Sequence, residues 1–308
     1  MNAAEIQSKI DALGGPGRVV IPPGLHWIES TLRIERSDVT LAGEGNPVLM
    51  TREGVGDVLR IGTGESQIDG VRVTGLTVCG GEDGARPTNT GHGILIRKAL
   101  RTKLVDVQVL RTALDCVSIE DSWWLKTEDC VFDLYHCGAD AVAFRHGRDS
   151  NNVLHSHSRF VARRSGVACQ IDHGASITFA SAEFSGDDDA GTGLKIAGTG
   201  YGVNVLACYF ENCGACAIDI AGSDGQILNP QLRGNFFSIN KGTAIRLGAV
   251  VRGMLQGNCF AGEGFTAIEA QDTERSEGTV IEADNYLSSN TARRVVDTGG
   301  RTVNKWAL

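Results

Sequence analysis

Histidine, carboxylate and basic side chains gather in one stretch of the sequence, residues 91–174. Four short apolar alternations in this stretch end on the bulky anchor residues Ile96, Ile119, Phe144 and Ile171. A charged or imidazole pair follows each anchor: Arg97 and Lys98, Glu120 and Asp121, Arg145 and His146, and Asp172 and His173. If the four segments lie side by side, these pairs form one compact polar surface.

Imidazole groups beside carboxylates are suited to acid–base catalysis. Histidine titrates near neutral pH, and a neighbouring carboxylate can orient its ring or raise its pKa. His146 or His173 is therefore the predicted base, and Arg145 or Lys195 the predicted cation that neutralises a substrate carboxylate. The full set of predicted catalytic residues is His146, His173, Asp172, Arg145, Asp121, Asp140, Asp115 and Lys195.

Further side chains are expected to bind the substrate. Residues 81–91 make one repeat about ten residues longer than the others and lead directly into His92. A long loop on a regular scaffold is often functional. Outward-facing aromatic rings could stack on a sugar or another flat ligand. The predicted substrate-binding residues are Glu120, His92, Arg97, Trp123, Trp124 and Tyr135.

The same polar residues also have a purely structural interpretation. Four residues that alternate in sign could form a surface ladder of ion pairs, each contributing little to stability: Arg97, Glu120, Arg145 and Asp172. Asp115 and Asp140 could accept hydrogen bonds from turn amides. Two histidines with carboxylates on both sides are nevertheless unusual on an inert surface, which favours a functional cluster.

The anchors belong to a repeat that continues along the chain. Their series runs on through Ile196, Ile220, Leu247 and Ala270, with successive spacings of 23 to 27 residues. A second series keeps step with it and ends in aromatic residues: Phe132, Phe160, Phe184, Phe210, Phe237, Phe260 and Tyr286. Two series in phase at about 25 residues predict a solenoid with three short strands per coil.

In such a solenoid, equivalent residues of neighbouring coils stack about 4.8 Å apart. The second series is therefore expected to form an internal aromatic ladder. Each end of the stack would be an open sheet edge that needs a cover. We predict a capping helix over residues 1–15, coils over 16–290 and a C-terminal cap over 291–308 that includes Trp306, all within one domain.

Composition limits the partners of the protein. The chain has 308 residues and a net charge of -8, which argues against a general nucleic-acid binder. Its nine cysteines lack paired metal-site spacing, since Cys213 and Cys216 form a single CxxC, so most are expected to be small buried hydrophobes. We find no transmembrane run and no signal-peptide pattern, and we expect a cytoplasmic setting.

The opening of the chain resembles a known family. The N-terminal helix followed by GGPGRVVIPPGLHWIESTLRI and VTLAGEG resembles the start of right-handed parallel β-helix proteins of the pectin lyase-like superfamily. This resemblance covers nearly the whole chain and implies an all-β, single-domain, right-handed parallel β-helix of about 9–11 coils with an N-terminal capping helix. The superfamily includes polysaccharide lyases, glycoside hydrolases, uronan epimerases, tailspikes and non-catalytic adhesins.

A closer resemblance to polygalacturonase-type hydrolases is degenerate. Asp115 in LDCVSI and Asp140 in GADAVAF match two of the acidic residues of that family. Ala139 replaces the other acidic residue, Ser165 replaces the histidine, and Lys195 and Ala197 replace the arginine and lysine. The inverting reaction needs an acid and a base on either side of a water, which this set does not supply.

The sequence therefore predicts a carbohydrate-active enzyme that acts on an acidic saccharide as a lyase, hydrolase or epimerase. One alternative is an intracellular dehydratase, isomerase or cyclase that uses the same groove on a small metabolite. Another is a non-catalytic tailspike- or adhesin-like β-helix. No cofactor is expected, although Asp121, Asp172 and Asp219 could converge on Ca²⁺. No nucleic-acid or membrane partner is expected, and the oligomeric state is left open.

Overall fold

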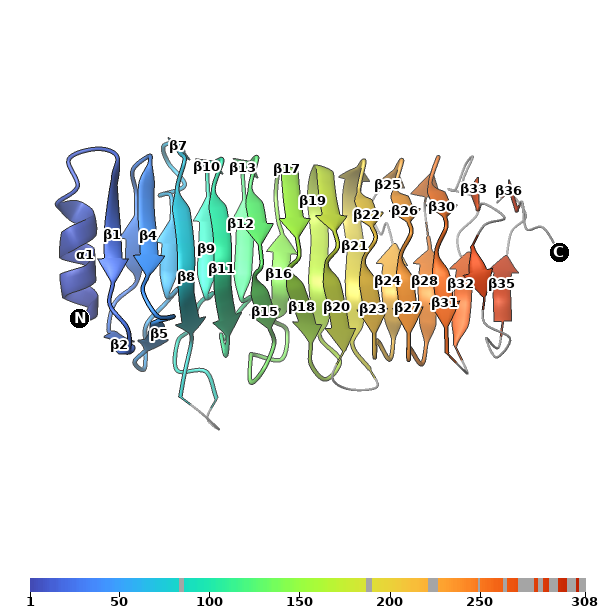
Figure 1. The fold of residues 1–308 in the computed structure, drawn as a ribbon, viewed down its shortest axis with the longest axis horizontal. Helices are drawn as coiled ribbons and strands as arrows, with labels where there is room; N and C mark the ends of the chain where they lie inside the picture. Colours follow the sequence, from blue (N-terminus) through green and yellow to red (C-terminus); the bar gives the residue numbers. More distant parts are fainter. Residues whose placement is uncertain are drawn as a thin grey trace. The chain divides into compact units, whose positions relative to one another are not determined.

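The computed structural model describes residues 1–82, 86–186, 190–220, 227–248, 250–262, 265–270, 280–281, 285–287, 293–297 and 303–304. One helix precedes a parallel β-solenoid of about ten turns, which confirms the predicted fold class (Figure 1). The chain divides into two compact units, Met1–Arg159 and Phe160–Leu308, which are described in turn. The assignment of all coils to one domain stays a prediction.

The first unit contains helix α1 (Ala3–Asp11) and three stacks of parallel strands. Sheet I contains β1 (Gly17–Ile21), β4 (Val39–Gly43), β8 (Arg72–Cys79), β11 (Lys103–Leu110), β14 (Lys126–Glu128) and β17 (Ser150–Ser156). Sheet II contains β2 (Leu25–Ile28), β5 (Val48–Thr51), the ends of β8 and β11, and β15 (Val131–Asp133). Sheet III contains β3 (Leu32–Ile34), β6 (Leu59–Ile61), β9 (Ile94–Arg97), β12 (Val117–Glu120) and β16 (Val142–His146). The connecting strands are β7 (Ile68–Asp69), β10 (Ala99–Leu100) and β13 (Ser122–Trp123).

The second unit repeats this arrangement. Its longest strands are β19 (Val167–Ala180) and β21 (Thr192–Tyr201), followed in the same stack by β24 (Cys216–Ile220), β28 (Thr243–Leu247), β32 (Thr266–Ala270) and β35 (Arg293–Asp297). A second stack has β22 (Asn204–Leu206), β26 (Gln231–Arg233), β30 (Met254–Gln256), β33 (Val280–Ile281) and β36 (Val303–Asn304). The third has β18 (Arg159–Ala162), β20 (Glu183–Gly186), β23 (Tyr209–Glu211), β27 (Phe236–Ser238), β31 (Cys259–Ala261) and β34 (Tyr286–Leu287). The connecting strands are β25 (Ile227–Leu228) and β29 (Val250–Val251).

Strand alternation in the sequence explains which side chains point inwards. In β6, Leu59 and Ile61 are fully buried, whereas Arg60 between them is partly exposed. Successive side chains of a strand point to opposite faces, so a three-residue strand such as β6 places its middle residue on the outer surface. A coil therefore contributes apolar residues to the interior and a few polar residues to each outer face.

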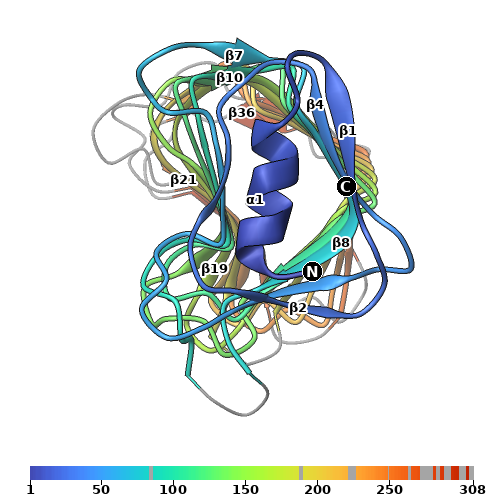
Figure 2. The same ribbon diagram turned by 90° about the vertical axis from the view of Figure 1, so that its left-hand side faces the viewer.

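Helix α1 covers the N-terminal end of the first unit, as predicted, and contacts β1, β2 and β3 (Figure 2). It buries Ala3, Ile6 and Ile10 against the first coil. Asn2 and Glu5 form a capping box, with both side-chain-to-backbone hydrogen bonds at 2.9 Å. The helix ends at Asp11, slightly earlier than the predicted residue 15.

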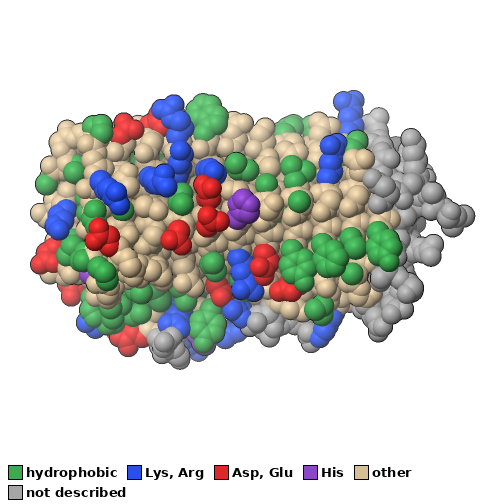
Figure 3. Space-filling view, viewed as in Figure 1, with side chains coloured by type: hydrophobic (Ala, Val, Ile, Leu, Met, Phe, Trp, Pro, Cys, Tyr) green, Lys and Arg blue, Asp and Glu red, His purple; other side chains and the backbone are tan. Residues whose placement is uncertain are grey.

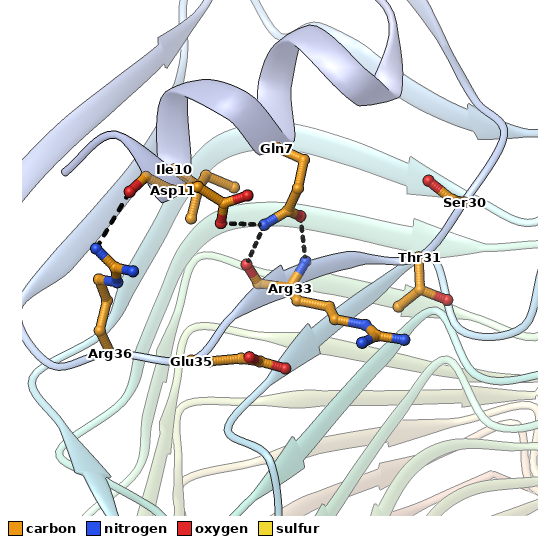
Figure 4. A pocket seen from close by; sticks show the side chains of 8 residues that line it. All are labelled: Gln7, Ile10, Asp11, Ser30, Thr31, Arg33, Glu35 and Arg36. Carbon is orange, nitrogen blue, oxygen red and sulfur yellow. Dashed lines mark hydrogen bonds between the residues drawn. The ribbon is translucent and has the colours of Figure 1, made fainter.

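Gln7 of α1 satisfies the open edge of β3. Its Oε1 accepts a hydrogen bond from the Arg33 backbone N–H at 2.8 Å, and its Nε2 donates to the Arg33 carbonyl at 3.1 Å (Figure 4). One amide side chain thus replaces the partner strand that an edge lacks. The adjoining pocket of about 420 Å³, which Asp11 and Arg36 also line, is part of this cap.

The predicted C-terminal cap falls largely outside the described residues. β35 and β36 are described as strands, whereas Trp306 is not among the described residues. A covering role for residues 291–308 therefore stays a prediction.

The predicted aromatic ladder is confirmed in the second unit. Phe184 stacks on Phe210 with ring centroids 4.6 Å apart, and Phe237 stacks on Phe260 at 4.9 Å. Tyr286 does not join the ladder, because Leu287 is the residue paired with Phe260. Tyr286 is instead 63% exposed.

A buried asparagine ladder runs beside the phenylalanines. Asn235 Nδ2 donates to Asn258 Oδ1, and Asn258 Nδ2 donates to Asn285 Oδ1, both at 2.9 Å. The same amide groups also donate to backbone carbonyls of the preceding coil, including those of Val205 and Leu232. The ladder satisfies backbone groups at a turn that would otherwise be buried without partners.

We predict that Asn258→Ala lowers the free energy of unfolding by about 2–4 kcal/mol, because several buried hydrogen-bonding groups lose a partner. Thermal and urea unfolding followed by circular dichroism would measure the change. Asn204→Ala is the matched control, because Asn204 is only half-buried and donates to Thr178 and Gly202. Equal destabilisation by both substitutions would contradict a special role for the ladder.

Candidate active site

Polar residues of neighbouring coils stand in line on the outer face of sheet III in the first unit. The pairing of Leu59 with Ile94, and of Ile94 with Val117, sets the register. Two residues before these positions lie Asp57, His92 and Asp115, which gives a carboxylate–imidazole–carboxylate column. One residue after them lie Arg60, Leu95 and Ser118, and Arg145 pairs with Ser118.

Each carboxylate of this column is held by an arginine. Asp115 is buried and accepts two hydrogen bonds from Arg145, Nε to Oδ2 at 2.8 Å and Nη2 to Oδ1 at 3.2 Å. The backbone N–H of Val142 donates to Asp115 Oδ1 at 2.8 Å. Asp57 Oδ2 similarly accepts from Arg60 Nη2 at 2.7 Å. These contacts fix both carboxylates in position.

His92 lies between the two carboxylates. Its backbone N–H donates to Asp57 Oδ1 at 2.9 Å, and its Nδ1 lies 3.7 Å from Asp115 Oδ2. Nδ1 is buried and has no hydrogen-bond partner, while 19% of the side chain is exposed. The exposed part of the ring is therefore on the Nε2 side, so one ring nitrogen faces a carboxylate and the other faces outwards.

The long repeat at residues 81–91 positions His92 through Asn89, which the sequence analysis did not identify. The buried Asn89 side chain donates to the Gly91 carbonyl at 2.8 Å and accepts from the Ala113 N–H at 3.0 Å. It also donates to the Gly56 carbonyl at 3.3 Å. Asn89 thus ties three successive coils together immediately before His92.

Asp57 and Arg60 were also missed. They lie in the segment DVLRI, which alternates apolar and polar residues as the later strands do but precedes the long repeat. Extending the repeat towards the N-terminus, past residues 81–91, would have aligned this segment with the later strands and identified both residues.

A second charged cluster lies further along the same strands. Arg97 Nε lies 2.8 Å from Glu120 Oε2, and Arg148 forms an ion pair with Asp121. These four residues line a pocket of about 280 Å³ together with residues 63–65. The Arg148 guanidinium holds the pKa of the Asp121 carboxyl below its ordinary value. Figure 3 shows acidic and basic side chains interspersed on the face of the first unit that is turned towards the viewer.

The predicted register was wrong for one coil. Phe144 pairs with Val117 and His146 pairs with Ile119, so His146 and not Phe144 occupies the anchor position. His146 is therefore fully buried in the interior and is not a surface base. Arg145 faces outwards beside Ser118 rather than beside Glu120, and Val142 replaces Asp140 in the column of Asp115.

Asp140 and two of the aromatic candidates lie between strands of the first unit, and Trp123 ends β13. Asp140 is exposed in the turn before β16. Trp124 is 53% exposed, whereas Trp123 is half-buried and meets it edge to face. Tyr135 is exposed and its ring lies under the Arg111 guanidinium. Trp124 therefore presents the largest accessible ring of the predicted sugar-stacking residues.

The remaining candidates lie in the second unit. His173 is exposed, and its Nδ1 lies 2.8 Å from Thr199 Oγ1. Gln170 donates to Asp172 Oδ1 at 2.7 Å. Lys195 pairs in register with Gln170 and Asp219 on the outer face. Their predicted catalytic roles stay predictions.

The outer column of the second unit supports the structural interpretation for its later coils. Arg246 lies 3.5 Å from Asp219 and 3.4 Å from Glu269. Asp219, Arg246 and Glu269 thus form an alternating ladder of ion pairs, the kind of arrangement that the structural interpretation proposed for Arg97, Glu120, Arg145 and Asp172.

The described part of the chain contains no group of three or more His, Cys, Asp or Glu side chains that could hold a metal ion. The Ca²⁺ site suggested for Asp121, Asp172 and Asp219 stays a prediction. None of the described helices is long and apolar enough to span a membrane.

Comparisons with known proteins identify the fold. No protein-family model and no curated protein matches the chain. Among solved structures, the tailspike protein of Escherichia coli bacteriophage HK620 in complex with a pentasaccharide is similar, with a TM-score of 0.71, 13% identity, and coverage of 98% of this chain and 60% of the tailspike. The chain has a parallel β-helix fold.

Enzymes share this fold. DFA-IIIase from Arthrobacter chlorophenolicus is similar with a TM-score of 0.61 and 11% identity, covering 98% of this chain and 81% of the enzyme. The mannuronan C-5 epimerase A-module from Azotobacter vinelandii has a TM-score of 0.54 and 17% identity, covering 98% and 95%. The chain spans 61% and 64% of the first two phage structures that it matches. These identities show the fold, and the fold alone does not determine a reaction.

The buried position of His146 has a consequence for stability. His146 Nε2 lies 3.0 Å from His155 Nε2, and His155 Nδ1 lies 2.7 Å from Thr127 Oγ1, all inside the first unit. Burial lowers the pKa of His146 to about 3 and lowers that of His155, which the neighbouring His146 lowers further. Both rings are therefore neutral in the folded protein at neutral pH.

We predict that stability falls as the pH is lowered from about 6.5 towards about 3, because the unfolded chain then binds protons that the folded chain cannot. Each histidine contributes a slope of at most about 1.4 kcal/mol per pH unit. Urea midpoints measured across this range would show the loss. The double substitution His146→Leu and His155→Leu should flatten the profile, whereas His157→Gln, on an exposed residue, should not. Unchanged slopes in the double variant would contradict this account.

Proposed function

We propose that the protein is an enzyme that acts on an acidic saccharide by acid–base chemistry on the outer face of sheet III. The observation that carries the proposal is the placement of His92. Its buried Nδ1 faces Asp115, while the other side of the ring faces outwards. A carboxylate that orients one ring nitrogen while the other meets the substrate is a recurrent arrangement for a general base.

The surroundings of His92 suit this role. Asp115 is held by Arg145 and by the Val142 N–H, so its carboxylate cannot turn away from the imidazole without losing those bonds. Asn89 fixes the backbone just before His92. The base and its orienting group therefore rest on strands and buried hydrogen bonds, which gives the precise positioning that catalysis requires.

Cations on the same face favour an acidic substrate. Arg60 and Arg97 have side chains that are 37% and 43% exposed. A guanidinium can bind a substrate carboxylate through two parallel hydrogen bonds, even while it shares a protein carboxylate. Abstraction of a proton next to a uronate carboxyl would need a base, a cation and a proton donor, and His92, Arg60 or Arg97, and Glu120 are the residues that we assign.

A second candidate function is saccharide binding without turnover. The pairing of Arg97 with Glu120, and of Arg148 with Asp121, favours it, because carboxylates already engaged in ion pairs are less available as acids. The exposed Trp124 could serve either function by stacking on a sugar ring.

We predict that His92→Ala lowers kcat about 10²- to 10⁴-fold, because the general base is lost. Turnover would be measured on a panel of uronic-acid polymers and oligomers, by release of reducing ends, by formation of unsaturated products and by epimer composition. His173→Ala is the matched control, because His173 is exposed in the second unit. Loss of turnover only in His173→Ala would contradict the assignment, and saccharide binding without turnover by the unsubstituted protein would favour the second function.

We predict that Asp115→Asn lowers kcat by roughly 10²-fold or more and changes KM little, because the substitution disturbs the orientation of His92 and not substrate binding. Steady-state kinetics and the melting temperature would be measured together. Asp57→Asn is the comparison, because Asp57 is also held by an arginine but bonds to His92 at its backbone N–H and not at its ring. A fall in kcat that merely follows the loss of folded protein would contradict a positioning role.

A further inference from the structure

We propose that Cys116 and Cys137 form a peroxide-sensitive pair, in which Cys137 is oxidised first and Cys116 then closes a disulfide within the first unit. Their Sγ atoms lie 3.8 Å apart, in contact but not bonded. Disulfide formation requires an approach to about 2.05 Å. Cys137 lies in the connection between β15 and β16, so its side chain is not part of a strand ladder that would hold it away from Cys116.

The two thiols differ in access. Cys137 is half-buried, whereas Cys116, which directly precedes β12, is fully buried. An oxidant from solvent therefore reaches Cys137 first. Cys116 can react only with a group that is already in contact with it, which is the position of a resolving thiol.

The hydrogen bonds that Cys116 and Thr112 donate to the Cys137 sulfur favour its thiolate. Its sulfur accepts from the Thr112 backbone N–H at 3.2 Å and lies 3.5 Å from the Thr112 hydroxyl. A hydrogen bond from the Cys116 thiol, followed by those from Thr112, lowers the pKa of Cys137 despite its burial. Burial raises the pKa of the Cys116 thiol. The more accessible sulfur is thus also the more nucleophilic one.

The chemistry balances with hydrogen peroxide as the oxidant. The Cys137 thiolate attacks one peroxide oxygen, which gives a sulfenic acid and hydroxide. The Cys116 thiol then attacks the Cys137 sulfur, the S–O bond breaks, and the oxygen leaves as water with the proton of the Cys116 thiol. The hydroxide of the first step becomes the second water by taking up the proton that Cys137 released when it ionised. Overall, two thiols and one peroxide give one disulfide and two waters, and a dithiol reductant reverses the change.

The cross-link would join two segments that adjoin the candidate active site. Cys116 follows Asp115 in the chain, and the segment of Cys137 leads into Val142, whose N–H donates to Asp115. The disulfide itself does not depend on the proposed function, because it requires only the two sulfurs and their hydrogen bonds.

The test is to treat the folded protein with hydrogen peroxide, alkylate the remaining thiols and map the peptides by mass spectrometry. We expect a reductant-sensitive cross-link between the peptides of Cys116 and Cys137. In Cys116→Ser, we expect Cys137 to accumulate as a sulfenic acid that dimedone traps. In Cys137→Ser, we expect Cys116 to stay reduced.

Cys259→Ser is the matched control, because Cys259 is also half-buried but burial raises its pKa. It should not change the cross-link. Circular dichroism of each variant would confirm that it is folded. The proposal would be overturned if the cross-link forms only in denaturant, if Cys259 is oxidised faster than Cys137, or if Cys116→Ser leaves Cys137 unreactive while remaining folded.

Discussion

Parallel pairing between successive coils is the constraint on which the rest of this structure depends. The described strands pair with their equivalents in neighbouring coils, 23 residues apart for β9 and β12 and 27 for β23 and β27, so each side chain stacks on a counterpart at the strand spacing of about 4.8 Å. A side chain is favourable at its position only if it packs against, or bonds to, the equivalent side chains of the two neighbouring coils. Phenylalanine therefore stacks on phenylalanine, asparagine bonds to asparagine, and acidic side chains alternate with arginine on the outer face.

The same constraint explains how a site is built from a repeating fold. A regular ladder places the same kind of side chain on every coil, and an active site requires a departure from this regularity. The long repeat before β9 provides it, because it places His92 between Asp57 and Asp115, in a column where carboxylates would otherwise repel each other. The buried Asn89 side chain bonds to the backbone of Gly56 and of Ala113, in the coils on either side. Cys137 lies in another irregular connection, where the sulfur is free of the ladder and can meet Cys116.

The interior also contains polar side chains, which the repeat of apolar anchor residues does not predict. His146, His155 and Thr127 replace aliphatic residues inside the first unit and bond to one another. Burial keeps both rings neutral at neutral pH. The core tolerates this polar cluster only while the rings are neutral, because a buried charge without a partner is costly.

The sequence by itself determined the fold, the N-terminal cap and the internal phenylalanine series, because a nearly regular repeat with alternating burial permits few other structures. It also predicted the region of the candidate site. It also identified His92, Asp115, Glu120 and Arg97 as neighbours on one face. Only the tertiary structure decided the register of the coil that contains Phe144, because a shift of two residues preserves the alternation of inward and outward side chains. That shift placed His146 in the core and Arg145 beside Asp115. Pairing between coils, and not the pattern within one coil, selects between two such registers.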